Sequence, residues 1–313
     1  MQKSRQCIFS VDVEDWFHIL DVPRAPDVAS WSGLPSRVEA NFRRLLDLFS
    51  AQGRYVTCFF LGWIAERFPH LVREAVARGH EIASHGYAHR LAYRMTRSEF
   101  RADALRSRLL LEDISGTPVI GYRAAGFSST EATPWFFAEL SASGYLYDSS
   151  VFPARRGHGG NPNSPLGPHF VPGEALIEIP ASVAEVGPTR MCFFGGGYLR
   201  LFPYCIIRHM GRRVLADGGP LVFYIHPREI DPQHPRIPMP YGRRFRSYVN
   251  LHTTEAKIRR IIREFPVTTC REYLFGSAAE LPHKKPALST LVNPQLMASR
   301  TANPRDRANV GHP

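Results

Sequence analysis

The sequence predicts an α/β protein in which mostly parallel strands curve into a deformed (β/α) barrel of about seven strands. Two observations support this prediction. Strand-like and helix-like segments alternate along the chain, and charged or metal-binding side chains stand at the ends of five strand-like segments. An open, doubly wound sheet is the alternative architecture. The 313 residues, 44% of them hydrophobic, are enough for one large domain or for two ordinary ones.

Short apolar, β-branched or aromatic runs mark the expected strands. Residues 7–13 form the first expected strand, and residues 221–225 are expected to form a strongly buried strand. The other expected strands are 55–61, 81–83, 119–122, 146–147, 177–180 and 267–269. In a barrel, the carboxyl ends of such strands, and therefore the chemistry, lie on one face.

Helices are expected where apolar residues recur every three or four positions between these strands. The first spans about 36–52, with Ser36 as its cap and Gly53 after its end. The others are expected over 69–78, 96–114, 131–143, 203–216 and about 253–265. Two stretches, 153–175 and 227–248, are expected to be irregular loops, and loops of such length are often functional.

The folded domain is expected to occupy residues 1–275. Residues 276–313 are rich in Pro, Ser, Asn and Arg without periodicity, which predicts a disordered tail. No apolar run approaches the roughly 18–20 residues of a membrane span, and no leader pattern with a cleavage site precedes the first strand. We therefore expect a cytoplasmic protein that acts before export, near the inner membrane. The five scattered cysteines are expected to be buried, reduced thiols.

The formal net charge of +11 concerns partners rather than fold. A basic balance suits an anionic glycan, an anionic lipid carrier, a membrane surface or nucleic acid. The basic residues are dispersed and no nucleic-acid motif is present, so we expect no nucleic-acid partner and mostly solvated helix faces. Peripheral association with the membrane through the basic surface stays open, and the sequence does not predict the oligomeric state.

Polar groups at five strand ends predict a single site. In chain order they are Asp12-Val13-Glu14-Asp15, His85 with His89, Arg123, Asp148 and His226. Taken alone, each has a simpler explanation, such as a helix cap, an ion pair or a surface histidine pair. Their joint placement at strand ends indicates a catalytic pocket instead.

A metal site is the chemistry that this set suggests first. His85 and His89 are four residues apart, so on one helical turn both imidazoles would face the same way and supply two nitrogens to zinc or a similar ion. Glu14 or Asp15 can provide the third ligand. Asp12 is then the choice for the base that takes a proton from the attacking water.

The order of these residues resembles the five motifs of the polysaccharide deacetylase family, the NodB-homology or carbohydrate esterase family four. The segments that carry the likeness are 11–16, 85–89, 122–128, 147–153 and 223–232. The closest likeness is to the branch encoded with exosortase (PEP-CTERM) exopolysaccharide loci. It covers roughly residues 7–275 and implies a NodB-type, TIM-barrel-like fold.

The resemblance implies a role for each matching catalytic residue. Asp12 would be the general base, and Arg123 would keep it ionised and oriented. His226, oriented by Asp148, would be the general acid for the leaving amine. The backbone N–H of Gly126 would share the oxyanion with the metal.

The resemblance also implies a divalent metal ion, with Zn²⁺ as the expected ion. His85 and His89 would bind it together with a carboxylate of the first motif. In most relatives that carboxylate directly follows the base, but Val13 stands there in this chain. The ligand therefore moves to Glu14, with Asp15 as the fallback.

Two further departures from the family pattern concern the loops around the site. Ala125 stands where the third motif usually has proline, next to the expected oxyanion donor. Residues 154–160 differ from the run that usually follows the fourth motif, so the glycan is expected to differ from that of relatives.

The function implied is metal-dependent removal of acetyl groups from a polysaccharide or lipid-linked glycan in exopolysaccharide biosynthesis. An N-acetyl group of an amino sugar is the first choice, although the same groups could cleave an O-acetyl ester. The alternatives are hydrolysis of another carbon–nitrogen bond, as in a cyclic ureide or a formamide, and a non-catalytic glycan-binding relative. The sequence does not identify the sugar.

Overall fold

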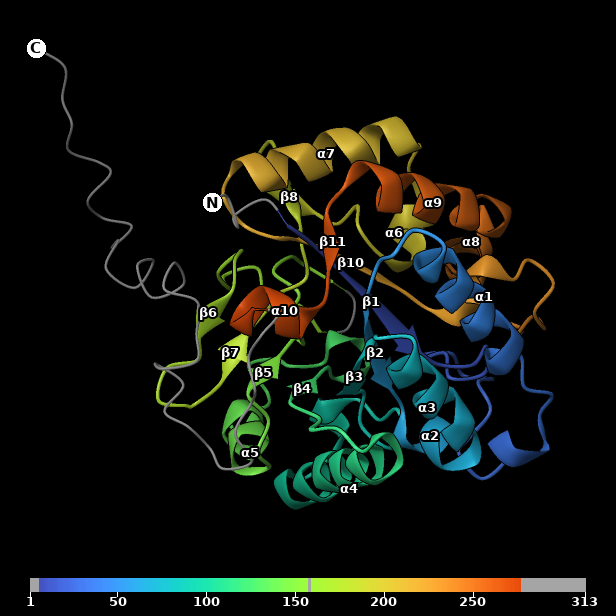
Figure 1. Cartoon of the computed structure of the whole chain (residues 1–313), viewed down its shortest axis with the longest axis vertical. Helices are drawn as coiled ribbons and strands as arrows, with labels where there is room; N and C mark the ends of the chain where they lie inside the picture. The colour runs from blue at the N-terminus through green and yellow to red at the C-terminus, as the bar shows by residue number, and fades with distance from the viewer. Residues whose placement is uncertain (1–5, 157–158, 277–313) are drawn as a thin grey trace, which may run out of the picture.

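The computed structural model describes residues 6–156 and 159–276, in which strands and helices alternate around a curved sheet (Figure 1). The parallel strands are β1 (Cys7–Val13), β2 (Thr57–Phe60), β3 (Glu81–Ser84), β4 (Gly121–Tyr122), β5 (Tyr147–Asp148), β7 (Ile177–Glu178), β10 (Leu221–Ile225) and β11 (Val267–Thr268). The short β6 (His169–Phe170) runs antiparallel to β7, and β8 (Ala184–Val186) with β9 (Thr189–Met191) forms a separate hairpin.

The main sheet has the strand order β10-β1-β2-β3-β4-β5-β7-β6, and β11 pairs with the start of β1. Its curved run of parallel strands confirms the expected deformed barrel. No ladder joins β7 to β10 in the described part of the chain. Ser182 bridges this gap, because its Oγ accepts a hydrogen bond from Val222 N at 2.8 Å and donates one to Pro220 O at 3.2 Å.

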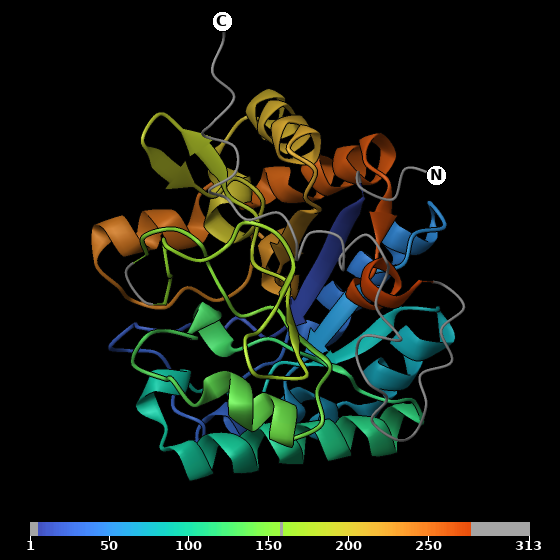
Figure 2. The same cartoon turned by 90° about the vertical axis from the view of Figure 1, so that its left-hand side faces the viewer.

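Ten α-helices in the described residues surround the sheet. They are α1 (Val38–Ser50), α2 (Gly62–Arg67), α3 (Pro69–Ala77), α4 (Arg97–Ser115), α5 (Phe136–Ala142), α6 (Gly196–Leu201), α7 (Tyr204–Ala216), α8 (Tyr241–Tyr248), α9 (Thr254–Glu264) and α10 (Cys270–Phe275). In the view turned by 90°, α4 lies along one side of the sheet and α7 with α9 along the other (Figure 2). This is the layering expected of an α/β barrel.

Alternating side chains of β1 separate the outer core from the barrel interior. Phe9 and Val11 pack in the large cluster that includes the helices, whereas Ile8 joins a smaller cluster with Phe59 of β2. Because successive side chains of a strand point to opposite faces, Asp12 shares the interior face with Ile8. Cys270 and Leu274 of α10 fill the same smaller cluster. The apolar packing inside the barrel thus lies near the start of β1, and the acid stands near its end.

The sequence missed four helices, α2, α6, α8 and α10, and the three short strands β6, β8 and β9. α8 falls in the stretch expected to be an irregular loop, because its eight residues include three arginines and one glycine. α2 and α10 have only six residues each, too few for a helical period to show. Among the described residues of 153–175, β6 is the one strand, and the rest are irregular as expected.

Several other expectations concern the chain as a whole. Four cysteines are buried and Cys205 is exposed; all five, which lie in the described residues, are free thiols. No helix among the described residues is long and apolar enough to cross a bilayer. Apart from Gly276, the tail predicted over 276–313 lies outside the described residues.

Candidate active site

The predicted convergence of the strand ends is confirmed in one cavity of about 960 Å³. The site residues that line it are Asp12, Glu14, His85, His89, Gly126 and His226. Arg123 and Asp148 are fully buried beside this lining rather than part of it. The parallel strands therefore bring the six groups to one edge from segments more than 200 residues apart.

Glu14 and the two histidines form a compact set of possible metal ligands. Glu14 Oε1 lies 3.2 Å from His85 Nε2 and 3.0 Å from His89 Nε2. The ligand atoms of the three side chains all lie within 4.8 Å of one another. A carboxylate with two imidazole nitrogens is a donor set that zinc and similar ions take in hydrolases.

The surroundings of these three residues support the same conclusion. His85 Nδ1 lies 2.7 Å from the carbonyl oxygen of Arg123, so Nε2 is the nitrogen that faces Glu14. His89 Nε2 is buried, and the nearest acidic group to it is Glu14, whose Oε1 lies 3.0 Å away. Burial alone would raise the pKa of Glu14, but the nearby His89 and His226 lower this pKa well below its usual value. An ionised carboxylate oxygen that faces two imidazole nitrogens fits a bound cation.

The loop that carries the two histidines is not the helical turn that we expected. His89 has a φ of 51° and Gly86 one of 72°, both in the left-handed region. The Asp103 carboxylate of α4 accepts a hydrogen bond from Tyr87 N at 2.8 Å. The Gly86 carbonyl in turn accepts from Gly62 N, at the start of α2, at 2.8 Å. Contacts with two helices therefore replace the internal bonds of a helical turn.

Asp15, the fallback ligand, is engaged elsewhere. Its carboxylate accepts hydrogen bonds from Ser36 Oγ at 2.5 Å and from the backbone N–H of Arg37 at 3.0 Å, at the start of α1. It therefore caps that helix, a role that we had expected of Ser36 itself. The structure brings Glu14, and not Asp15, to the two histidines.

Arg123 and Asp12 form a buried ion pair. Arg123 Nη1 donates to Asp12 Oδ1 at 2.7 Å, and the same nitrogen donates to Ser10 Oγ at 2.7 Å. The guanidinium also donates to the backbone oxygen and the Oγ of Ser149, and it lies 4.1 Å from the ring centroid of Phe59. These contacts fix one oxygen of Asp12, while Oδ2 lies 3.8 Å from His226 Nε2.

Glu229, and not Asp148, contacts the imidazole of His226. Glu229 Oε1 lies 2.5 Å from His226 Nδ1, and Nε2 of the same ring lies 3.6 Å from Glu14. Burial would lower the pKa of His226, but Glu14 and Glu229 raise it above its usual value. The second Glu229 oxygen lies 3.2 Å from Arg200, which holds this carboxylate in place.

Asp148 instead supports the neighbouring loop. Its carboxylate accepts from Ser150 Oγ at 2.6 Å, and the oxygen of that hydroxyl accepts from Ala124 N at 2.7 Å. Asp148 lies beside the buried Glu178, and burial raises the pKa of Asp148 to about 6. The orienting role predicted for Asp148 therefore needs correction: it acts on the turn after Arg123, because β5 points its side chain there.

Gly126 lies in that turn, the 3-10 segment Ala125–Phe127. Its φ of 62° is in the left-handed region, which glycine adopts without strain. Ala125, at the position where relatives usually have proline, is 2% exposed. Gly126 lines the same cavity as Asp12.

Sequence reasoning missed several residues around the site. Glu229 stands three residues after His226, so a search for carboxylates within one turn of that histidine could have found it. Asp103 left no such signal, because α4 alone brings it under the histidine loop. His18 is buried, accepts from Asp15 N at 2.9 Å, and leaves its Nε2 without a partner.

In comparisons with known proteins, two family models match successive parts of the chain. Residues 31–143 match the family model for polysaccharide deacetylase, and residues 149–275 match a domain of unknown function, DUF3473. A peptidoglycan deacetylase of Helicobacter pylori is 31% identical over 113 residues, which cover 36% of this chain and 38% of that protein. The matches support the polysaccharide deacetylase family. The exosortase branch within it stays a prediction.

Two further matches are a second curated relative and a solved structure. A peptidoglycan-N-acetylglucosamine deacetylase of Bacillus cereus is 29% identical over 73 residues, 23% of this chain and 26% of that protein. The chain therefore matches well under half the length of either curated relative. A solved Mycobacterium smegmatis structure classed with polysaccharide deacetylases has a TM-score of 0.56 at 20% identity, covering 84% of this chain and 86% of its own. At that identity the likeness concerns the fold.

Proposed function

We propose that this protein is a metal-dependent hydrolase that removes acetyl groups from a glycan, with an N-acetyl group of an amino sugar as the substrate group. The observation that carries the proposal is one cavity that holds Glu14, His85 and His89 together with Asp12 and His226. The names of the matched relatives support it, since both are deacetylases of peptidoglycan.

Glu14, His85 and His89 would hold the divalent ion, which we expect to be Zn²⁺. The fit rests on the buried Glu14 oxygen, which faces Nε2 of both His85 and His89. When bound, such an ion supplies Lewis acidity toward a carbonyl oxygen and lowers the pKa of water. Asp12 and His226 remain available for proton transfer.

The protein's own residues account for the proton movements. Asp12 takes a proton from the water that adds to the acetyl carbon, and the ion pair with Arg123 holds it in position. The backbone N–H of Gly126 is the proposed donor to the resulting oxyanion. His226 then gives a proton to the departing nitrogen as the carbon–nitrogen bond breaks. The products are acetate and a free amine on the sugar.

Glu229 and Arg200 would prepare His226 for this step. A carboxylate beside Nδ1 favours the protonated imidazole, and this leaves the Nε2 proton available toward the cavity. Arg200 pairs with Glu229 from the opposite side and so prevents its carboxylate from rotating away. As a prediction from the family resemblance, we place this reaction in exopolysaccharide biosynthesis, on a polysaccharide or lipid-linked glycan.

Acetate release tests the proposal directly. Purified protein, supplied with Zn²⁺, would be incubated with N-acetylglucosamine oligomers, and with allantoin and an N-formylated amino sugar as the alternative carbon–nitrogen substrates. The expected result is acetate from the oligomers, with none from Asp12→Asn. Turnover of allantoin or the formamide alone would favour a hydrolase of another carbon–nitrogen bond. Glycan binding without any turnover would favour a non-catalytic glycan-binding protein.

A further inference from the structure

Six arginines line the cavity that holds the proposed metal ligands. They are Arg155, Arg156, Arg200, Arg228, Arg243 and Arg246. They come from the loop after β5, from α6, from the loop after β10 and from α8, so four separate segments direct positive charge to one place. Arg200 already pairs with Glu229. The question is what the others bind.

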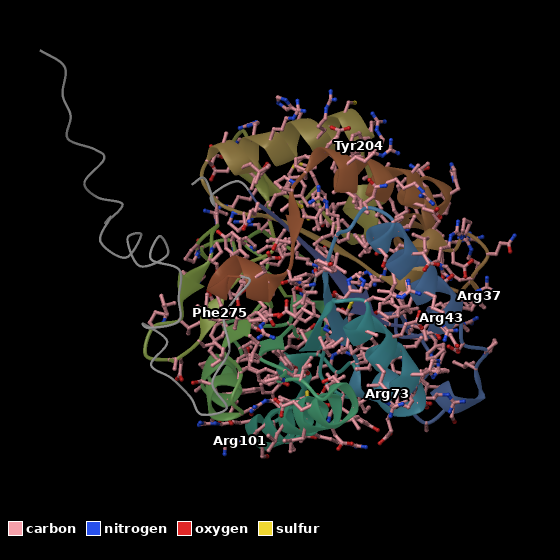
Figure 3. The ribbon with its side chains drawn as sticks, in the orientation of Figure 1. Arg37, Arg43, Arg73, Arg101, Tyr204 and Phe275 are labelled. Atoms are coloured by element: carbon pink, nitrogen blue, oxygen red, sulfur yellow. The ribbon has the colours of Figure 1, made fainter. Side chains whose placement is uncertain are left out.

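Several arginines on the outer surface of the molecule differ from these because they have acidic partners. Among those labelled in Figure 3, Arg43 of α1 pairs with Glu39 and Glu74, and Arg101 of α4 pairs with Glu139. Exposed ion pairs of this kind are ordinary surface features.

Apart from Arg200, none of the cavity arginines forms an ion pair among the described residues, and three of them have a buried nitrogen without a hydrogen-bond acceptor. These atoms are Nη1 of Arg156, Nε of Arg228 and Nε of Arg243. Arg243 makes one hydrogen bond, from Nη2 to the backbone oxygen of Leu20 at 2.8 Å. A buried donor without an acceptor is costly, and more so when it is charged.

The three arginines also act on one another. Burial, then Arg228 and Arg246, and more weakly Arg156, lower the pKa of Arg243, while Asp21 raises it. Asp21 is itself engaged by Arg94 at 3.0 Å. Like charges gathered in a half-buried cavity therefore outweigh the acid that faces them. A bound anion would relieve both the repulsion and the missing acceptors.

The position of these arginines relates them to the reaction. Arg228 follows the proposed general acid, His226, by two residues. The Arg156 guanidinium lies 5.4 Å from the ring centroid of Phe127 and 5.0 Å from that of Phe152, and Phe127 directly follows Gly126. A ligand group held here would adjoin the acetyl group under attack.

We propose that Arg156, Arg228 and Arg243 form a binding site for an oxyanion of the substrate, so that the protein acts on an acidic glycan. This inference rests on the proposed function and adds the substrate class to it. Guanidinium groups bind carboxylate and phosphate oxygens in pairs. The oxyanion is either the carboxylate of a uronic acid in the glycan or the phosphate of a lipid-linked precursor. Neutral oligomers lack this contact and bind more weakly.

Calorimetric titration of the full chain with Zn²⁺ tests this site. The probes are an oligoglucuronate for the sugar acid and inorganic pyrophosphate for the lipid-linked source, with a neutral N-acetylglucosamine oligomer for comparison. Variants Arg228→Gln and Arg243→Gln remove the proposed contacts. Arg212→Gln is the matched control, because Arg212 is an exposed arginine of α7 with no ion pair in the described residues.

We expect one of the two anions to bind to the wild type. In each cavity variant the affinity for that anion should fall by about tenfold or more. Arg212→Gln and the inactive Asp12→Asn should bind like the wild type. Arg228→Lys, which keeps the charge, should retain part of the affinity and so guards against a variant that merely fails to fold. The anion that binds identifies its source.

The inference is overturned if neither anion binds, or if Arg212→Gln weakens binding as much as the cavity variants do. Its failure is separable from that of the proposed function. Acetate release from neutral oligomers without anion binding would leave the hydrolase in place and remove the acidic substrate. Anion binding without acetate release from any substrate would support the anion site and contradict the proposed hydrolase.

Discussion

His226 Nδ1 lies 2.5 Å from Oε1 of Glu229, and the other oxygen of Glu229 lies 3.2 Å from Arg200. These two contacts connect the proposed general acid, His226, to Arg200 of α6. Arg200 in turn donates hydrogen bonds to the backbone oxygens of Ser247 and Arg246 in α8. The state of the imidazole therefore depends on a carboxylate that the 3-10 turn Pro227–Ile230 supplies.

The first prediction concerns the pH dependence of activity. Burial lowers the pKa of His226, and Glu14 and Glu229 raise it above its usual value. A general acid must be protonated, so activity falls as the pH rises through this pKa. Glu229→Gln removes part of the rise, and the alkaline limb of the kcat profile should move to lower pH. Glu131→Gln, at an exposed position, is the control, and an unmoved limb in Glu229→Gln would refute the orienting role.

The second prediction concerns the buried ion pair. Arg123→Met leaves the charge of Asp12 without its partner in a buried site, so unfolding in urea should require about 3–5 kcal/mol less than in the wild type. Arg259→Met breaks an exposed pair with Glu255 and should cost less than about 1 kcal/mol. Equal effects of the two variants would show that the Arg123 pair contributes no more than a surface pair.

The third prediction concerns Asp148 and Glu178, two buried carboxyl groups side by side. Burial raises the pKa of Asp148 to about 6, and burial with the adjacent Asp148 raises that of Glu178 further. Raised carboxyl pKa values give stability that is complete below about pH 4 and is lost as the pH rises through about 6. Glu178→Gln should therefore gain stability relative to the wild type as the pH rises through about 6. Parallel pH curves of the two proteins in urea unfolding would contradict this.

The fourth prediction concerns the loop of His85 and His89. Asp103→Ala removes the acceptor of Tyr87 N, although Asp103 is not a proposed ligand. Zn²⁺ affinity, measured by competition with a chelating dye, should fall about 10- to 100-fold, as for other residues that support metal ligands. Asp113→Ala, on the exposed face of the same helix, is the control. Unchanged affinity in Asp103→Ala would mean that α2 alone fixes the loop.

Much of the site was predictable because parallel strands have a simple geometry. Once residues 7–13, 81–84 and 221–225 are recognised as strands of one barrel, Asp12, His85 and His226 must meet at its carboxyl edge. The spacing of the motifs along the chain carries this information. It needs no knowledge of loop conformation.

The rest depends on conformations that no short pattern specifies. Asp15 and Glu14 are neighbours in sequence, and only the packing of α1 decides that Asp15 caps a helix. The histidine loop takes left-handed conformations because Asp103 and α2 satisfy its backbone. The arginine cluster is assembled from segments about 90 residues apart, one of them the polar α8, so composition showed the charge but not where it gathers.

The most direct test of the whole account is a Zn²⁺ titration of acetate release by the chelator-treated protein, on the substrate that the screen identifies. We predict no activity without metal, a rise in rate that saturates near one ion per chain, and no recovery in the His85→Ala/His89→Ala double variant. Full activity after exhaustive removal of metal, or the same recovery in the double variant, would contradict the proposed site.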